Sequence, residues 1–432
     1  MAIKERLLKQ LNIVWDGLNA MPPFHSRDLN TMRNALVRAR DLCFQGLPSG
    51  RFGDYQDTYD GLLLAVNQLI AGAADSQEIA SLCDELLQHL SAQTQKETAF
   101  KKEIFFLPYK ASMWDSLESV WRAAADDVEH CIAYVMPIPY ADLTPEHTVA
   151  EWHYEKEMFP KDVPTVNWED VDLQEIHPDA IFIHNPYDNY NRVTSVESRY
   201  YSPKLKECTD MLVYIPYYIL GKIDLNNAKI MEWVSGFALC SSVLNADVTI
   251  VQSEVVRQAY VKSLTQYTDQ KDEEFWKKRI LGIGSPKIDK VMCVKREDYV
   301  LPKKWRTRIK GKTVVLYNTS LGDFLLSDEE KALNKWKITI KKFSERSDVI
   351  LWWRPHPLMK ATIDSMRPQI SRKYDELIND YKESSIGIYD DSAELDRAIV
   401  WSDAYYGDRG SVLHLYEKTG KPMLIQDYST ED

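Results

Sequence analysis

Apolar residues recur at three- and four-residue steps through roughly the first hundred residues, which is the spacing of one face of a helix. A representative set is Ile79, Leu82, Leu86, Leu87 and Leu90. Clusters at Met21–Pro23 and Gly46–Gly50 interrupt the pattern, because proline lacks a backbone donor and glycine relaxes the chain. The sequence therefore predicts a helical domain over residues 1–98.

The pattern changes at Lys102 to short apolar runs that alternate with amphipathic stretches. This alternation is typical of parallel strands joined by crossover helices. Ser112 is placed to cap a helix that runs to Asp127, and Ser253 is placed to cap another. The expected strands are Ile104–Leu107, Cys131–Pro137, Ala180–His184, Met211–Ile215 and Val248–Gln252. We predict a first Rossmann-type domain over residues 99–294.

A charged stretch without apolar periodicity, Lys295–Gly311, separates this domain from a second series of strands and helices. The expected strands are Lys312–Tyr317, Val349–Trp353, Gly387–Tyr389, Ala404–Tyr406 and Met423–Ile425. The predicted fold class is α/β, with a pair of Rossmann-type domains, the second over residues 295–432, and an N-terminal helical appendage. Since ligands bind beyond the carboxyl ends of parallel strands, facing domains place a substrate cleft between them.

Composition and charge exclude several function classes. The 65 acidic and 53 basic residues give a formal net charge of −12 without a long basic run, so nucleic acid is not an expected partner. Six scattered cysteines form no Cys-x-x-Cys pair, which indicates a reducing, cytoplasmic setting. We expect neither a signal peptide at the charged amino terminus nor a membrane-spanning helix.

Common cofactor and metal motifs do not occur in the sequence. Gly282–Lys287 lacks the third glycine of the dinucleotide fingerprint, and there is no phosphate-binding P-loop. His147 and His153 do not have the spacing of a helical zinc pair, so no metal site is predicted.

The segment Ser402–Ser411 runs from a predicted strand through a glycine-bearing turn into a predicted helix. Amides at a helix start attract anions, Gly410 allows a phosphate to approach the backbone, and the Ser411 hydroxyl adds a donor. Together with Asp408, these residues predict a seat for a diphosphate. The alternative is an ordinary helix cap with turn glycines.

A second candidate for anion binding is Trp352–Pro357, where a predicted strand ends at Arg354 and two prolines stiffen the loop that follows. Arg354 can contact two phosphate oxygens at once. His356 can donate a hydrogen bond to a leaving phosphate or act as an acid. The alternative is a surface ion pair beside a hydrogen-bonded loop histidine.

Two further donor-site candidates have simpler structural interpretations. Asp391 and Ser392 follow the predicted strand Gly387–Tyr389, where a helix cap is the favoured interpretation and contact with a nucleotide ribose or base edge is the alternative. Lys421 lies in Gly420–Pro422, a sequence typical of a helix stop, with assistance in phosphate binding as the alternative.

The first Rossmann-type domain offers candidates at two predicted strand ends. Lys110 and Ser112 follow the first strand and are placed to contact an anionic acceptor. His184 ends a later strand with Asp188 four residues on, and a histidine oriented by an acid can serve as a general base for an acceptor hydroxyl. The alternative is that His184 caps its strand and Asp188 begins a turn.

These residues resemble the CDP-glycerol glycerophosphotransferase family, whose members build teichoic-acid-type polymers on the cytoplasmic face of Gram-positive bacteria. The resemblance lies mainly over residues 280–426. It rests on Gly284–Asp289, on Arg354–Pro357, and on Asp403 followed by Asp408–Ser411 and Lys421–Pro422.

The resemblance implies a GT-B fold, two Rossmann-like domains with the donor held by the C-terminal one. It implies transfer of glycerol phosphate or a similar alcohol phosphate from a CDP-activated donor to a hydroxyl of a polymer or lipid-linked acceptor in cell-wall synthesis. CDP-glycerol or a related nucleotide would then be a substrate, and the scheme requires no cofactor.

Two other functions stay open. One is a GT-B glycosyltransferase that uses a sugar nucleotide, and the other is a non-catalytic nucleotide-binding or assembly protein with residues 1–98 as a docking module. Peripheral association with the inner membrane face also stays open, although the mixed charge of the helical domain gives it no strongly basic face. Homo-oligomerisation stays open as well.

Overall fold

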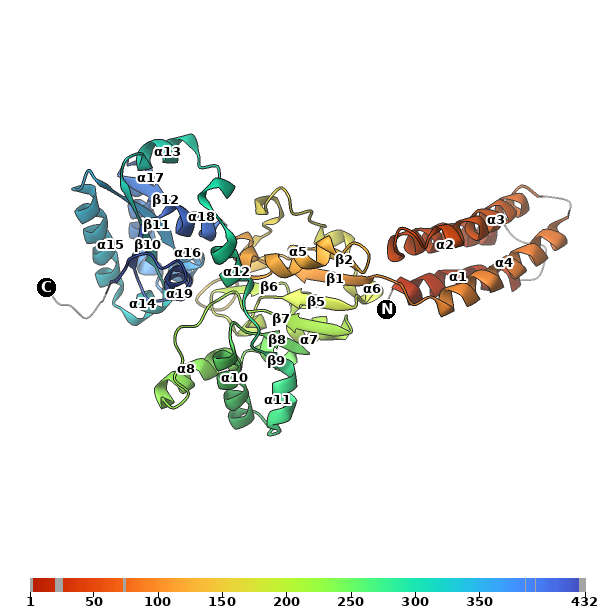
Figure 1. Ribbon diagram of the computed structural model, residues 1–432, viewed down its shortest axis with the longest axis horizontal. Helices are drawn as coiled ribbons and strands as arrows, with labels where there is room; N and C mark the ends of the chain where they lie inside the picture. The colour runs from red at the N-terminus through yellow and green to blue at the C-terminus, as the bar shows by residue number, and fades with distance from the viewer. Residues whose placement is uncertain (1–2, 20–25, 73–74, 385, 393, 427–432) are drawn as a thin grey trace.

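A computed structural model of the chain describes residues 3–19, 26–72, 75–384, 386–392 and 394–426. These residues form a helical bundle and two units that are each built on a parallel sheet (Figure 1). The bundle projects from the first of these units, on the side away from the second. The predicted pair of Rossmann-type domains with an N-terminal helical appendage is confirmed. Where each domain ends along the chain stays a prediction.

The bundle consists of α1 (Ile3–Asn19), α2 (Ser26–Gly46), α3 (Gly53–Ile70) and α4 (Ser76–Lys96). Helix α1 packs against both α2 and α4, and α3 packs against α2 and α4, so the helices enclose one core. The predicted interruption at Gly46–Gly50 is confirmed, whereas Met21–Pro23 lie outside the described residues. In the described ranges, none of the helices has both the length and the apolar character needed to cross a bilayer.

The first sheet has six parallel strands in the order β2-β1-β5-β7-β8-β9. Its strands are β1 (Lys102–Leu107), β2 (Cys131–Val135), β5 (Ala180–Ile183), β7 (Met211–Tyr214), β8 (Val248–Ile250) and β9 (Ile280–Leu281). The five predicted strands are confirmed, and β9 is added. Neighbouring residues of β1 face different cores, because Phe105 packs on one side of the sheet and Phe106 on the other.

The helices around this sheet follow the prediction only in part. A single helix from Ser112 to Asp127 is wrong, since a 3₁₀ helix (Ala111–Ser116) is separated from α5 (Glu118–Asp126) by Leu117, whose φ is −121°. Ser253 does cap α10 (Glu254–Tyr267) by accepting a hydrogen bond from an amide. The other helices are α6 (Leu173–Ile176), α7 (Ser202–Glu207), α8 (Ala228–Ala238), α9 (Ser241–Asn245), α11 (Glu273–Arg279) and α12 (Pro286–Cys293).

A small antiparallel sheet in the first unit was not predicted. Its order is β4-β3-β6, formed by β3 (Tyr140–Leu143), β4 (Val149–His153) and β6 (Thr194–Val196). After β4 the chain continues through Glu155 into a 3₁₀ turn at Lys156–Met158. This sheet and the turn after it bring further side chains to the cleft. The rule that ligands bind beyond the carboxyl ends of parallel strands does not identify these side chains.

The second sheet has five parallel strands in the order β12-β11-β10-β13-β14, which is the doubly wound order of a Rossmann half. Its strands are β10 (Thr313–Thr319), β11 (Val349–Pro355), β12 (Gly387–Tyr389), β13 (Ala404–Gly407) and β14 (Met423–Ile425), as predicted. Trp352 and Trp353 pack on opposite faces of the sheet. Both faces are therefore buried.

The helices of the second unit are α13 (Lys303–Ile309), α14 (Leu321–Leu326), α15 (Glu329–Ser344), α16 (Met359–Met366), α17 (Ser371–Glu383), α18 (Leu395–Trp401) and α19 (Ser411–Glu417). Helix α13 lies within the stretch predicted as a linker, Lys295–Gly311. Its Trp305 ring contacts the Trp352 ring edge-on at 5.1 Å, so part of this stretch packs against the second core.

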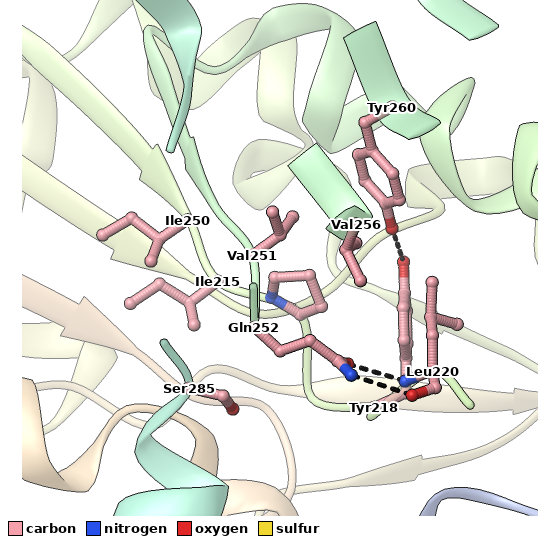
Figure 2. A pocket seen from close by; sticks show the side chains of 10 residues that line it. Ile215, Tyr218, Leu220, Ile250, Val251, Gln252, Val256, Tyr260 and Ser285 are labelled. Atoms are coloured by element: carbon pink, nitrogen blue, oxygen red, sulfur yellow. Dashed lines mark hydrogen bonds between the residues drawn. The ribbon is translucent and has the colours of Figure 1, made fainter. Parts of the chain in front are cut away.

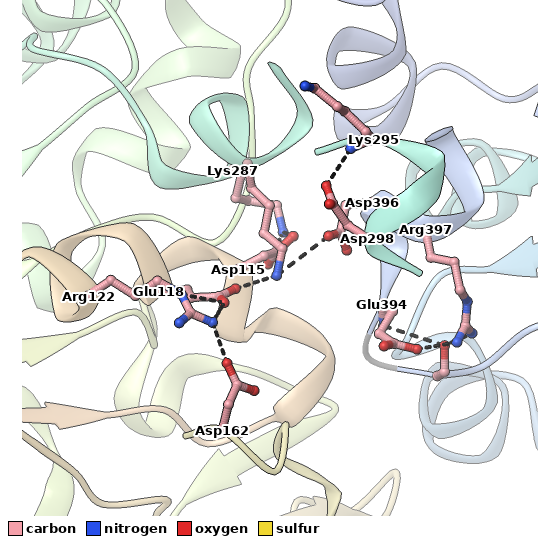
Figure 3. Close-up of polar contacts among 12 residues, drawn as sticks. Asp115, Glu118, Arg122, Asp162, Lys287, Lys295, Asp298, Glu394, Asp396 and Arg397 are labelled. Carbon is pink, nitrogen blue, oxygen red and sulfur yellow. Dashed lines mark hydrogen bonds and ion pairs between the residues drawn. The ribbon is translucent and has the colours of Figure 1, made fainter. Parts of the chain in front are cut away.

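Helix α12 connects the two units through ion pairs (Figure 3). Lys287 contacts both carboxylate oxygens of Asp115 at 2.5 and 2.6 Å. Lys290 pairs with Glu118 of the first unit and, at 3.5 Å, with Asp396 of the second. These contacts hold the units so that the carboxyl ends of both sheets border one cleft.

Candidate functional site

A cavity of about 230 Å³ lies between the two units. Lys110, Ser112 and Glu155 line it from the first unit, after β1 and β4. Lining residues of the second unit include Arg354, His356, Lys360, Asp390, Asp391 and Ser392. The structure therefore brings together six residues singled out in the sequence: Lys110, Ser112, Arg354, His356, Asp391 and Ser392.

Arg354 lies at the end of β11, and its guanidinium is nearly buried. Its Nη1 is 3.0 Å from Oδ2 of Asp390, which directly follows β12. Arg354 also donates to the backbone carbonyl of Ser392. These partners fix the guanidinium at the cavity wall, in an orientation that leaves the residue in contact with the cavity.

The buried carboxylate of Asp390 forms ion pairs with two arginines. Arg397 lies 3.3 Å from Oδ1 of Asp390, and the indole of Trp352 donates to Oδ2 at 3.0 Å. Burial raises the pKa of Asp390, but the charges of Arg354 and Arg397 outweigh it and hold the pKa below its ordinary value. Asp390 is therefore ionised at neutral pH, and it shares one negative charge between two guanidinium groups.

His356 is half-buried in the loop after β11 and lines the cavity. Its Nδ1 accepts a hydrogen bond from the amide of Leu358 at 3.1 Å, which requires the ring proton of the neutral form to be on Nε2. Burial, followed by the charges of Lys110 and Lys287, lowers the pKa of His356 to about 4. At neutral pH the imidazole is uncharged and presents Nε2–H as a hydrogen-bond donor.

The Lys110 ammonium stands on the opposite wall of the cavity and is nearly buried. It donates to the Tyr140 hydroxyl at 2.7 Å, and burial lowers the pKa of Lys110 while Glu155 partly restores it. Ser112 is half-buried beside it. The two walls therefore combine cationic and neutral donors from both units.

Asp391 and Ser392 do not cap α18, whose N-cap position is Glu394. The Ser392 hydroxyl donates to Asp390 at 2.6 Å and accepts from Arg397 at 2.7 Å, so it positions the charged cluster behind Arg354. Asp391 is exposed at the rim of the cavity, 3.3 Å from Lys382. The helix-cap interpretation of this pair is wrong.

The predicted His184–Asp188 pair is not formed. His184 is fully buried, its Nε2 accepts from the Tyr109 amide at 3.1 Å, and its Nδ1 lies 2.9 Å from the Ser116 hydroxyl. Asp188 instead accepts from the amide and hydroxyl of Ser202. Because both ring nitrogens are engaged and the residue does not line the cavity, assignment of His184 as a base for the acceptor is wrong.

Lys421 lies away from the cavity, although the prediction places it in contact with the donor. It precedes β14, at the amino ends of the strands, and its ammonium donates to three backbone carbonyls at the end of α18, those of Ile399, Val400 and Ser402. The residue therefore closes a helix end on the edge of the sheet opposite the cleft. Its predicted contact with the donor is wrong.

The segment after β13 lies at the carboxyl edge but outside the cavity lining. Asp408 is fully buried, where it accepts from the Ser320 amide at 2.7 Å and pairs with Lys335 at 3.0 Å. Gly410 is the N-cap of α19, a helix of seven residues that begins at Ser411, and neither residue lines the cavity. The predicted diphosphate seat of Asp408, Gly410 and Ser411 therefore does not share the cavity with Arg354 and His356.

Asp390, Glu155 and Tyr140 were missed by the sequence analysis. Asp390 follows a predicted strand directly, so the strand-end rule was sufficient to find it. Glu155 and Tyr140 belong to the antiparallel sheet and its exit, for which the sequence had no recognised signal. The described residues contain no group of three metal-binding side chains.

A second hollow, at the carboxyl edge of the first sheet, is too small for a substrate (Figure 2). It holds about 10 Å³, the size needed for one water molecule. Gln252 on its wall exchanges two hydrogen bonds with the backbone of Leu220, at 2.7 and 2.8 Å. Of these two hollows, the one lined by Arg354, His356 and Lys110 has room for a substrate.

No protein-family model and no curated protein sequence matches the chain. Similar solved structures include the UDP-GlcNAc 2-epimerase of Neisseria meningitidis bound to UDP-GlcNAc, with 10% identity over 76% of this chain and 83% of that chain and a TM-score of 0.45. The Methanocaldococcus jannaschii enzyme in complex with UDP-GlcNAc and UDP has 12% identity, covers 75% and 83%, and has a TM-score of 0.44.

A third structure is a variant of the wall teichoic acid polymerase TagF, with 13% identity over 87% of this chain and 80% of that chain and a TM-score of 0.40. Similarity at these levels assigns neither an activity nor a substrate to this chain.

Proposed function

We propose that the protein is a transferase that moves an alcohol phosphate, such as glycerol phosphate, from a CDP-activated donor to an acceptor hydroxyl. One observation carries the proposal: Arg354, the Nε2–H of neutral His356 and Lys110 line a single cavity between two Rossmann-type units. This set suits a diphosphate, because guanidinium and ammonium groups balance its charge and the imidazole supplies a neutral donor.

In this reaction the acceptor oxygen attacks the distal phosphorus of the donor, and a nucleoside monophosphate leaves. Negative charge grows on the bridging oxygen as its bond to phosphorus breaks. Fixed donors at that position stabilise the transition state, and one good donor contributes roughly 3–4 kcal/mol. We assign this role to Arg354 and His356, which the ion pair with Asp390 and the Leu358 amide hold in place.

The experiment is a calorimetric titration of the full chain with CDP-glycerol, CDP-ribitol and a UDP-sugar, followed by a turnover assay that measures release of the nucleotide product. We expect CDP-glycerol to bind and Arg354→Ala or His356→Ala to weaken binding at least tenfold. Arg372→Ala is the matched control, since Arg372 is exposed on α17 and outside the cavity.

Binding of the UDP-sugar alone would replace the proposal with a glycosyltransferase on the same scaffold. Donor binding without release of the nucleotide product, under any acceptor tested, would instead support a non-catalytic nucleotide-binding protein. Unchanged affinity in both Arg354→Ala and His356→Ala would show that the donor binds elsewhere.

A further inference from the structure

The Glu155 carboxylate faces the cavity from the first unit and is held by two hydrogen bonds. Its Oε2 accepts from the Ala111 amide at 2.8 Å, and its Oε1 accepts from the Tyr140 hydroxyl at 2.5 Å. The Lys110 ammonium lies 3.9 Å from Oε1. Each carboxylate oxygen has two acceptor sites, so Oε1 and Oε2 each keep one for another donor.

A chain of hydrogen bonds sets the orientation of this carboxylate. Lys110 donates to Tyr140, and Tyr140 in turn donates to Glu155. Both donors are nearly buried, and burial raises the pKa of Tyr140 while it lowers that of Lys110. Tyr140 therefore keeps its proton at neutral pH and holds Glu155 as an acceptor.

Glu155 is also the carboxylate that the first unit contributes to the cavity lining. The other two lining carboxylates, Asp390 and Asp391, belong to the second unit, which carries Arg354 and His356. Asp390 is committed to two arginines, and Asp391 stands at the rim beside Lys382. A hydroxyl that enters along the first unit therefore meets Glu155 opposite Arg354 and His356.

We propose that Glu155 is the general base that activates the acceptor hydroxyl, an inference that rests on the function proposed above. The acceptor O–H proton moves to a Glu155 oxygen as the acceptor oxygen forms its bond to the distal phosphorus. The bond between that phosphorus and the bridging oxygen breaks, and its electron pair leaves with the nucleoside monophosphate. The protonated Glu155 then returns its proton to water. Tyr140 acts as a positioning residue, and Lys110, which also balances the charge of the donor, donates to Tyr140.

The test compares Glu155→Gln with wild type in CDP-glycerol binding and in CMP release, with glycerol or water as the hydroxyl acceptor. Glutamine keeps an oxygen that accepts from Tyr140 but cannot take the proton. We expect unchanged donor affinity and a loss of kcat of about 10²–10⁴-fold, the usual contribution of general base catalysis. Glu157→Gln is the matched control, because Glu157 is exposed two residues on and does not line the cavity.

The pH dependence of kcat separates a base from a merely structural residue. In wild type we expect kcat to fall on the acid side, and in Glu155→Gln this fall disappears. The charged and titratable groups near Glu155 are Lys110 and Tyr140 on the first unit, with Asp142 and Glu151 close to Tyr140, and Arg354, His356 and Lys360 across the cavity. Tyr140→Phe should lower kcat less than Glu155→Gln does, because it removes only one of the hydrogen bonds that hold the carboxylate.

Glu155→Asp tests the role without removing the carboxylate, and it should retain the acid limb with reduced kcat. Equal kcat and equal pH profiles in wild type and Glu155→Gln would overturn this inference and leave the proposed function standing. Wild-type protein that binds CDP-glycerol without releasing CMP would overturn the proposed function itself, and the inference with it. Thermal unfolding and donor affinity identify any variant that fails to fold.

Discussion

The Arg354 guanidinium and the Asp390 carboxylate lie 3.0 Å apart at the carboxyl ends of two adjacent strands, and both are nearly buried. Arg354 is the next-to-last residue of β11 and Asp390 follows β12, so the parallel register brings them together. The pair couples the stability of the second unit to the position of the group proposed to bind phosphate.

Asp390→Asn should destabilise the protein and weaken donor binding. The substitution leaves Arg354 and Arg397 buried without the charge that compensates them, and breaking a buried pair in this way costs about 3–5 kcal/mol. Urea unfolding measures the loss, and calorimetry with CDP-glycerol measures the affinity. Asp391→Asn is the control, since Asp391 is exposed and should change stability by less than about 0.5 kcal/mol. Equal stability of the two variants would contradict a structural role for Asp390.

The Lys287–Asp115 pair fixes α12 against the first unit (Figure 3). Lys287→Met should lower the free energy of unfolding by about 3–5 kcal/mol, because it leaves the buried Asp115 carboxylate without its partner. The double variant Lys287→Met/Asp115→Leu should recover much of this loss, since no buried charge then stays unpaired. Lys295→Met serves as an exposed control. A double variant no more stable than Lys287→Met would contradict the explanation.

The sequence was sufficient to identify the parallel strands because their apolar runs are buried on both faces. Trp352 and Trp353 are adjacent in β11, yet each enters a different core. The antiparallel sheet has no such signal, because β4 is a largely exposed edge strand and Trp152 on it is 52% exposed. The strands that the sequence predicts are therefore the ones buried on both faces, because their residues form a continuous apolar run.

The same distinction applies to the site. Arg354 and His356 were identified because a strand end fixes where the backbone of the next residues lies. A strand end does not fix where a side chain points. The His184 ring points into the core, where the Tyr109 amide and the Ser116 hydroxyl contact it. The prediction for Lys421 is wrong for a different reason. Lys421 precedes β14, so it lies at the edge of the sheet opposite the cleft.

His184 should make stability depend on pH. Burial, with a smaller contribution from Lys287, lowers the pKa of His184 to about 3, whereas an unfolded histidine has a pKa of about 6.5. Between these values the unfolded chain binds a proton that the folded chain does not, so the folded state loses stability as pH falls below about 6.5. At pH 5.0 the loss is about 2 kcal/mol.

Urea unfolding at pH 7.5 and 5.0 checks this expectation by comparing wild type with His184→Asn. The variant is less stable at pH 7.5, because it loses packing in the core, but its stability should fall less between the two pH values. His130→Asn is the control, since His130 is exposed and outside any core. An identical pH dependence in wild type and His184→Asn would show that His184 is not kept neutral by the fold.

Gly407 ends β13 where the chain turns toward the cleft, and the neighbouring strand leaves no room for a side chain. A Cβ at this position would lie 2.2 Å from the backbone oxygen of Asn318 in β10, and the φ of Gly407 is +154°. Gly407→Ala should therefore force β10 and β13 apart and cost at least about 2 kcal/mol.

Gly236→Ala in α8 is the matched control, because nothing lies within 4 Å of its added Cβ. That variant should gain about 0.5–1 kcal/mol, since alanine is the better helix former. The two variants are unfolded under the same conditions. If the close approach to Asn318 excludes a side chain, the free energy of unfolding falls in Gly407→Ala and rises in Gly236→Ala. Because Asp408 follows Gly407 and donates its amide to the same Asn318 oxygen, loss of this contact also loosens the chain at the edge of the second sheet that faces the cleft.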